Sequence, residues 1–322
     1  MPLLIGTDEA GYGPNLGPLT ITATAWNLPD GLRPEALWDA LASVLTNAPT
    51  RNDSRLHVAD SKQVYSAGRS IASLERSVHA FLRILKLPTG SVAELCGGIG
   101  PERFDADYSH VLSGIVDELR LPDVADDSDC VSQSTAVARV LAESGVSLVS
   151  IRTRIIFAPE FNAAVAQTDS KGKVLSAATL QLISDAVADA TAADESNEAT
   201  GWVVCDKHGG RNRYDDVISD AFPDKFVFCQ EESGPRSVYK VGNLKFCFRT
   251  KAEAVLPVAL ASMVSKYVRE VIMKQFNRFW QHHISDLKAT KGYPMDAKRF
   301  WNDIEDTAKN LNIEKSSIWR CR

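Results

Sequence analysis

Two adjacent carboxylates, Asp8 and Glu9, stand at the end of an apolar run, residues 3–5, that predicts a strand buried on both faces. Acids in such a position are costly to bury unless a cation compensates them. A glycine-rich turn follows over residues 10–18, and residues 19–26 then alternate apolar side chains with threonine, as a half-buried strand does. The predicted order is therefore strand, acidic pair, loop with accessible backbone, and strand.

Two other interpretations of this segment carry less weight. Gly11, Gly13 and Gly17 resemble part of a dinucleotide-binding fingerprint, but that fingerprint requires glycines that open a helix. Pro14, Pro18 and the threonine-alternating run oppose a helix here. An ordinary hairpin with solvated acids is the second alternative, and the position of the acids at the end of a buried strand weakens it.

Further acids at predicted element ends complete a possible metal site. Asp206 ends a second apolar run, residues 202–205, and Glu253 begins a predicted helix. Hydrolysis of a phosphodiester by two divalent ions requires several carboxylates, with the metals about 3.5 to 4 Å apart. Oxygen ligands without Cys or His favour Mg²⁺ or Mn²⁺. If the strands of Asp8 and Asp206 are neighbours in one sheet, the two aspartates lie side by side at its edge. The structural alternatives are a strand-end cap for Asp206 and a first-turn residue stabilised by the helix dipole for Glu253.

Residues 5–19 resemble the opening signature of type 2 ribonucleases H (ribonuclease HII), in which Asp-Glu precedes Gly-Arg-Gly-Pro. Other segments resemble further motifs of the family in the same order, namely 60–62 (Asp-Ser-Lys), 203–206, 251–253, 261–270 and 291–294 (Lys-Gly-Tyr-Pro). Two positions depart from the pattern, because Tyr12 replaces an Arg and Glu253 stands where an Asp is usual. The segment between Glu253 and the helix motif 261–270 is also one residue shorter than in the family, so the register of Glu253 is uncertain by one residue.

The resemblance implies a ribonuclease H-like mixed sheet flanked by helices, with an inserted segment and a C-terminal helical part. It implies a metal-dependent endonuclease that hydrolyses the RNA strand of RNA/DNA hybrids, or ribonucleotides embedded in DNA. The implied catalytic and metal-binding residues are Asp8, Glu9, Asp206 and Glu253, which would hold Mg²⁺ or Mn²⁺ in a two-metal site.

Substrate contacts follow partly from the resemblance and partly from local charge. In the family the glycine loop presents backbone groups to 2'-hydroxyls, which distinguish RNA from DNA, and the Tyr of Lys-Gly-Tyr stacks on a sugar. A basic stretch directly after Asp206 adds cations that attract a polyanion. The predicted substrate-binding residues are Gly11, Tyr12, Gly13, Lys62, Lys207, Arg211 and Tyr293.

The 322 residues, of which 44% are hydrophobic, are enough to bury a large core. We expect one domain, 1–322, with an insertion at about 88–133 and a helical extension from about 280, because typical family members have about two thirds of this length. We expect helices over 34–45, 70–84, 108–119, 134–144, 173–191, 252–278 and 296–311, and further strands over 146–157, 201–206, 225–229 and 244–249.

Composition limits the other classes of function. The formal net charge of −5 argues against a nucleic-acid binder unless a local basic patch exists, for which residues 207–213 are the candidate. The six scattered cysteines form no Cys-x-x-Cys pair, so we expect reduced thiols and no zinc. The chain has no apolar run long enough to span a membrane and no signal peptide, so we expect a cytoplasmic monomer.

A function of a different class remains open. A ribonuclease H-like nucleic-acid-binding protein, or a nuclease of altered specificity, would lack hybrid cleavage. Tyr12 and the insertion favour this alternative, whereas the retained acids favour the enzyme. Single residues also have structural alternatives. Lys62 could be a solvated lysine, Tyr293 could be a packed aromatic residue, and Glu270 could form a surface ion pair.

Overall fold

A computed structural model of the protein describes residues 1–68, 70–100, 118–192 and 199–321. Its centre is a seven-stranded sheet in the order β5-β2-β1-β6-β9-β8-β7. The strands are β1 (Leu3–Ala10), β2 (Leu19–Asn27), β5 (Ser147–Ile156), β6 (Gly201–Asp206), β7 (Val227–Glu232), β8 (Arg236–Val241) and β9 (Leu244–Arg249). A small parallel pair, β3 (Leu45–Thr46) and β4 (Leu56–His57), lies apart from this sheet.

The sheet is mixed. β1 pairs antiparallel with β2 and parallel with β6, and β6 pairs parallel with β9. The β7–β8–β9 meander extends the sheet to one edge through antiparallel pairs. The two strands that carry the predicted aspartates are therefore neighbours, as the sequence led us to expect. Asp206 is the last residue of β6, but Asp8 does not end its strand as predicted, because pairing with β2 continues β1 to Ala10.

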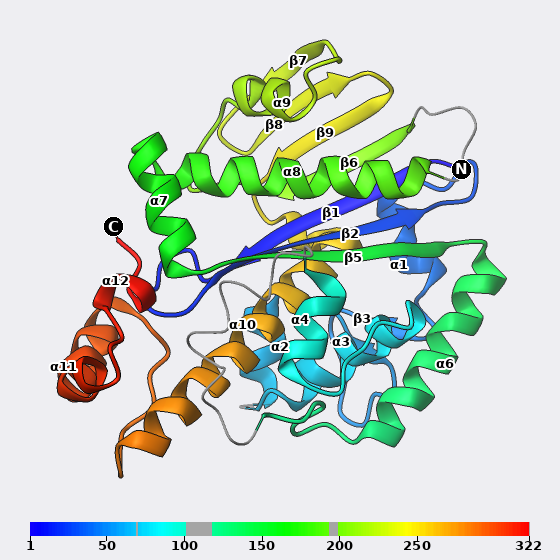
Figure 1. Cartoon of the computed structure of the whole chain (residues 1–322). Helices are drawn as coiled ribbons and strands as arrows, with labels where there is room; N and C mark the ends of the chain where they lie inside the picture. Colours follow the sequence, from blue (N-terminus) through cyan, green and yellow to red (C-terminus); the bar gives the residue numbers. More distant parts are fainter. Residues whose placement is uncertain (69, 101–117, 193–198, 322) are drawn as a thin grey trace.

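Helices cover both faces of the sheet (Figure 1). They are α1 (Leu37–Ala40), α2 (Ser61–Gly68), α3 (Ala72–Ile84), α4 (Val92–Ile99), α6 (Asp127–Ser144), α7 (Ala158–Thr168), α8 (Lys171–Thr191), α9 (Asp215–Ala221), α10 (Leu256–His283), α11 (Pro294–Asn310) and α12 (Lys315–Ile318), with short 3₁₀ turns at η1 (Pro34–Ala36) and η2 (Ala252–Ala254). α10 packs on β1 and β2 from one side, and α8 packs on β2 and β5 from the other. The predicted mixed sheet flanked by helices is confirmed.

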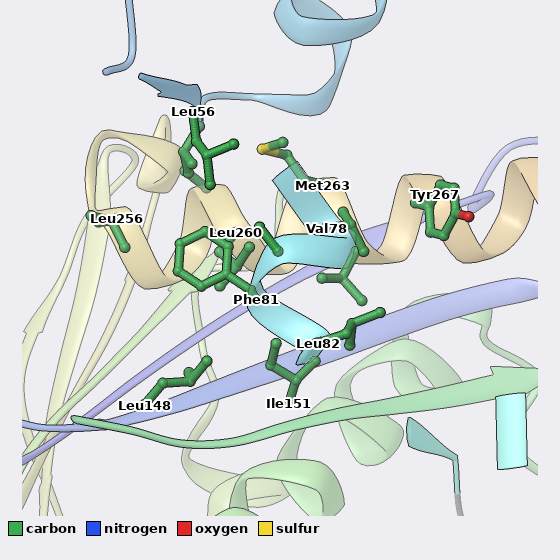
Figure 2. Packing of buried hydrophobic residues seen from close by; sticks show 14 of the residues in the cluster. Leu56, Val78, Phe81, Leu82, Leu148, Ile151, Leu256, Leu260, Met263 and Tyr267 are labelled. Carbon is green, nitrogen blue, oxygen red and sulfur yellow. The ribbon is translucent and has the colours of Figure 1, made fainter. Parts of the chain in front are cut away.

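The largest buried cluster lies between the sheet, α10 and α3 (Figure 2). Phe81 from α3 meets Leu260 from α10 and Ile151 from β5 in this cluster. A second cluster lies under α8, and a third joins α11 to the end of α10. α10 thus contributes residues to the first and the third cluster. Within the described parts of the chain, no helix is long and apolar enough to cross a membrane.

β2 differs from the half-buried strand that its alternation predicts, because it is buried on both faces. Its threonine hydroxyls find partners instead of water. Thr20 donates to the Ser265 carbonyl at 2.9 Å and Thr24 donates to the Pro257 carbonyl at 2.9 Å. Buried hydroxyls are tolerated when they are hydrogen-bonded, so the threonine face of β2 attaches α10 to the sheet.

Several element predictions need correction. The helix expected over 34–45 is only η1 and α1, and the chain turns at Leu41, whose φ of −110° is not helical. The helix expected from 134 begins at Asp127, where the Asp126 side chain caps it. β8 was missed. The helix expected over 108–119 lies almost wholly outside the described residues, as does part of the proposed insertion.

The approach of α10 to β1 leads to a stability prediction at Gly6. A Cβ atom at this position would lie 2.4 Å from the Pro257 carbonyl carbon and 2.4 Å from the Val258 nitrogen, which are backbone atoms that cannot rotate away. We expect Gly6→Ala to lower the free energy of unfolding by about 1 to 3 kcal/mol through overpacking. Urea denaturation measures this change.

Gly97 in α4 provides the control, because a Cβ there meets nothing within 4 Å. Gly97→Ala should leave stability unchanged or raise it by up to about 1 kcal/mol through helix propensity. Equal effects of the two substitutions would contradict the tight β1–α10 contact.

Candidate active site

Asp8, two residues before the end of β1, lies beside Asp206, the last residue of β6. Thr7 pairs with Cys205 in the parallel register, so the next residue on each strand is one of the aspartates. Alternation along the strands puts both carboxylates on the face that Gly6 presents to α10. Asp8 is 9% exposed, and Asp206 is half-buried.

The charges of these acids act on one another and on Glu9. Burial, followed by the charge of Glu9, raises the pKa of Asp8 well above its ordinary value. Burial, followed by the charge of Asp206, raises the pKa of Glu9 to about 7. Burial also raises the pKa of Asp206. The three acids therefore share one electrostatic environment that lacks enough positive charge.

Glu253 joins this group from η2. Its side chain is half-buried, and burial, followed by the charges of Asp206 and Asp60, raises its pKa. The backbone N–H of Ala252, in the same turn, opposes the rise that burial causes in the pKa of Asp206. The structure thus brings all four predicted acids together, although sequence register alone left Glu253 uncertain by one residue.

Two polar groups from α2 and α10 border the acids. The Ser262 hydroxyl lies 3.1 Å from the Ser61 hydroxyl and close enough to the Asp8 carboxyl to oppose the rise in its pKa. This contact holds the segment of Asp60 and Lys62 next to the acids, and the positive charge of Lys62 opposes the rise in the pKa of both Glu9 and Asp206. Lys62 is exposed, so its ammonium remains accessible from solvent.

The donor set fits a hard divalent cation, since carboxylate oxygens are the ligands that Mg²⁺ and Mn²⁺ prefer. The repulsion that raises the pKa of these acids is also what a bound cation would remove. Even so, no group of three or more His, Cys, Asp or Glu side chains among the described residues is already arranged to hold a metal ion. Binding therefore requires the side chains to adjust.

The glycine loop, residues 10–18, follows the acids directly, and a hydrogen bond from Arg269 attaches it to α10. Gly11 has a φ of +87°, and a Cβ atom there would lie 2.5 Å from the Arg269 Nε. Arg269 donates to the carbonyls of Leu16 and Lys291, and so joins the loop to the segment before Tyr293. Tyr293 itself is 54% exposed. Gly13 faces open space, because a Cβ there meets nothing within 4 Å.

Arg320 is a loop contact that the sequence did not reveal. Its guanidinium is buried and donates to the carbonyls of Gly11 and Pro14, while its backbone N–H donates to the Asn15 carbonyl at 2.8 Å. Burial, followed by the charge of Arg269, lowers the pKa of Arg320 to about 9. No motif marks this arginine, because its partners are some 300 positions away in the chain.

Tyr12 and the basic stretch are less available than predicted. Tyr12 is half-buried, packs against the second core cluster, and its hydroxyl lies near Gly209. Lys207 is buried and donates to Asn212 at 2.6 Å and to the Ser233 carbonyl at 2.7 Å. Arg211 is paired with Asp216 at 2.6 Å.

The expected basic patch is therefore not a set of free cations. His208, within the same stretch, is buried, and burial lowers its pKa to about 3. Glu270 pairs with Lys266 at 2.6 Å, as its ion-pair interpretation predicts, but both side chains are half-buried. The six cysteines are free, as expected.

Comparison with known proteins finds no matching family model and no matching curated protein. Similar solved structures include ribonuclease HII of Archaeoglobus fulgidus in a complex with PCNA, at 11% identity and a TM-score of 0.41, covering 99% of this chain and 94% of that one. Another is ribonuclease H2 of Pyrococcus horikoshii, at 13% identity and a TM-score of 0.40, covering 98% and 92%.

A third similar structure is Bst-RNase HIII in complex with Mn²⁺, at 13% identity and a TM-score of 0.41, covering 99% of this chain and 66% of that one. At such identities and TM-scores, these likenesses assign neither an activity nor a ligand to this chain.

The raised pKa of Glu9 leads to a prediction about stability. In the unfolded chain Glu9 ionises near its ordinary value of 4.5, whereas in the folded protein it keeps its proton up to about pH 7. The folded state binds more protons in this window, so this group lowers stability as the pH rises from 4.5 to 7. In EDTA, Glu9→Gln should therefore raise the melting temperature more at pH 8 than at pH 5.

Glu143 on α6 is the control, because its side chain is 66% exposed and pairs with Arg139, and its charge does not contribute to the pKa shifts of the four acids. Glu143→Gln should change the melting temperature equally at both values of pH. If Glu9→Gln changes the melting temperature by the same amount at pH 5 and pH 8, the pKa of Glu9 is not raised in the folded protein.

Proposed function

We propose that this protein is a metal-dependent endonuclease of the ribonuclease H type, which hydrolyses the RNA strand of RNA/DNA hybrids or ribonucleotides embedded in DNA. The observation that carries the proposal is the meeting of Asp8, Glu9 and Asp206 at the ends of two adjacent parallel strands, with Glu253 beside them. Unpaired acids that repel one another lower stability, so their clustering is better explained by a bound cation than by packing.

Asp8, Glu9, Asp206 and Glu253 would hold Mg²⁺ or Mn²⁺. When bound, such ions lower the pKa of a water molecule and stabilise the charge that develops on the phosphate. The residues around them have separate roles. Lys62 attracts the phosphodiester toward the acids, and Ser262 fixes the orientation of the Asp8 carboxyl.

The glycine loop would recognise the ribose. The Gly11 carbonyl already accepts a hydrogen bond from Arg320. A 2'-hydroxyl would therefore hydrogen-bond to other backbone groups of the loop. The open space at Gly13 allows a nucleic-acid strand to approach the backbone closely. The exposed ring of Tyr293, next to a segment that is hydrogen-bonded to this loop, would stack on a sugar or base.

A second candidate is a nucleic-acid-binding protein, or a nuclease of altered specificity, without hybrid cleavage. The position of Tyr12 favours it, because a half-buried phenol in place of an arginine supplies no charge to the substrate.

Hydrolysis assays distinguish these functions. With Mn²⁺ or Mg²⁺, we expect cleavage of an RNA/DNA hybrid, or of a duplex with one ribonucleotide, but not of plain DNA. Asp206→Asn should lower turnover by roughly 10²-fold or more, since it removes a group that positions charge in the transition state, while the circular-dichroism spectrum stays unchanged.

The matched control is Asp306→Asn, because Asp306 lies on α11 with its side chain 98% exposed. This variant should retain full turnover. Wild-type turnover of Asp206→Asn, or equal turnover in EDTA, would contradict the metal-dependent mechanism. Binding of the hybrid without cleavage of any of the three substrates would favour the second candidate.

A further inference from the structure

A cleft of about 840 Å³ opens on the sheet face that carries Asp206. Strands β6, β9 and β8 form its floor, the loop before α1 forms one wall, and the end of β7 forms the other. The described lining residues that matter below are Arg33, Trp202, Arg236, Lys245, Cys247 and Arg249. None of them belongs to the acidic site.

Strand register joins this cleft to the acids. Arg249 is the direct partner of Asp206 on β9, and Arg236 is the partner of Arg249 on β8. Paired residues on neighbouring strands project on the same face. The cleft therefore begins one strand away from the Asp206 carboxylate.

The same register continues down the face. Four residues below, Trp202, Lys245, Lys240 and Phe228 form a second row across β6, β9, β8 and β7. The rise of a strand is about 3.3 Å per residue, so the two rows are roughly 13 Å apart. Cations thus stand at both ends of the cleft.

The cleft carries more free positive than negative charge. Among the described residues, the side chains of Arg33, Lys245 and Arg249 have no ion-pair or hydrogen-bond partner, whereas Arg236 is paired with Glu231 at 2.7 Å. Glu35 is the other acid of the lining. The cations act on a common point, because Arg249, Arg236 and Lys245 all oppose the rise that burial causes in the pKa of Cys247.

The size of the cleft and its aromatic side chains limit the kind of ligand that it can bind. The volume lies within the range of about 300 to 1,000 Å³ that is typical of small-ligand pockets, which admits a short stretch of one strand but no duplex. Trp202 lines the cleft, and Phe228, 61% exposed, lies in the same row on the edge strand β7, so that bases can stack on aromatic rings there. Free cations along a groove that also offers aromatic rings are the features of a single-strand binding path.

We propose that this cleft binds single-stranded nucleic acid that continues from the strand held at the acids. The strand crosses Arg249 next to Asp206 and passes toward Lys245 and Arg33. This path extends the proposed function and rests on it, because the strand is taken to enter the cleft from the acidic site. It also supplies the local positive surface that the stretch 207–213 does not provide, because Lys207 is buried and Arg211 is ion-paired.

Salt dependence of binding tests the cleft without any need for hydrolysis. The probe is fluorescein-labelled (dT)₁₂, measured by anisotropy in buffer without Mg²⁺ or Mn²⁺. Each phosphate contact with a single strand adds about 0.7 to the logarithmic salt slope, so three contacts predict a roughly 18-fold loss of affinity from 50 to 200 mM salt. The double substitution Arg33→Glu and Lys245→Glu should reduce this loss to about 2.6-fold, the value for one remaining contact.

A matched control comes from the opposite edge of the sheet. Arg139 lies on α6, which packs against β5, whereas the cleft lies toward β7 (Figure 1). Arg139→Glu, combined with Lys309→Glu at an exposed position of α11, changes the net charge by the same amount. This control should retain the wild-type salt slope. Because all four side chains are on the surface, circular dichroism should show unchanged folds.

The outcomes separate the two proposals when hybrid hydrolysis is measured in parallel. Loss of the salt slope only in the Arg33 and Lys245 variant supports the cleft, even if no substrate is hydrolysed and the proposed function fails. Equal slopes in all three proteins overturn the cleft, even if the hybrid is cleaved. An equal decrease in the two double variants also overturns it, since the affinity would then follow net charge alone.

Discussion

The close contact between β1 and the start of α10 determines the arrangement of the whole site. Gly6 has no side chain, and this lets the backbone of Pro257 and Val258 lie directly on the strand. One helical turn later, Ser262 reaches the Asp8 carboxyl, and Ser265 donates to the Asp8 carbonyl at 3.0 Å. The contact therefore places polar groups of α10 at the point where the acids end their strands.

A cost in electrostatic free energy accompanies this geometry. The register of β1 and β6 brings two aspartates together, and Glu9 and Glu253 add further negative charge. Lys62 compensates only part of it from the surface. Raised pKa values are the consequence, because burial and repulsion both favour the protonated acids. A fold that keeps such a cluster next to a fastened glycine loop is suited to bind a cation and an anionic polymer together.

Much of this arrangement could be predicted from the sequence. Apolar runs that end in Asp8 and Asp206 identify buried strands, and an acid at the end of each indicates a shared edge. The long-range partners could not be predicted. The buried threonines of β2 depend on α10, Arg320 depends on loop carbonyls at the other end of the chain, and Lys207 is held by Ser233. Residue type reveals a charge, but only the fold reveals whether another group already uses it.

Diffraction from crystals soaked in Mn²⁺, recorded at a wavelength where manganese scatters anomalously, tests the carboxylate site most directly. The predicted result is anomalous density between the carboxylates of Asp8 and Asp206, with Glu9 or Glu253 as a further ligand, and its loss in Asp206→Asn crystals. Mn²⁺ bound only elsewhere, or an empty acidic cluster at saturating Mn²⁺, would contradict a cation site at the ends of β1 and β6.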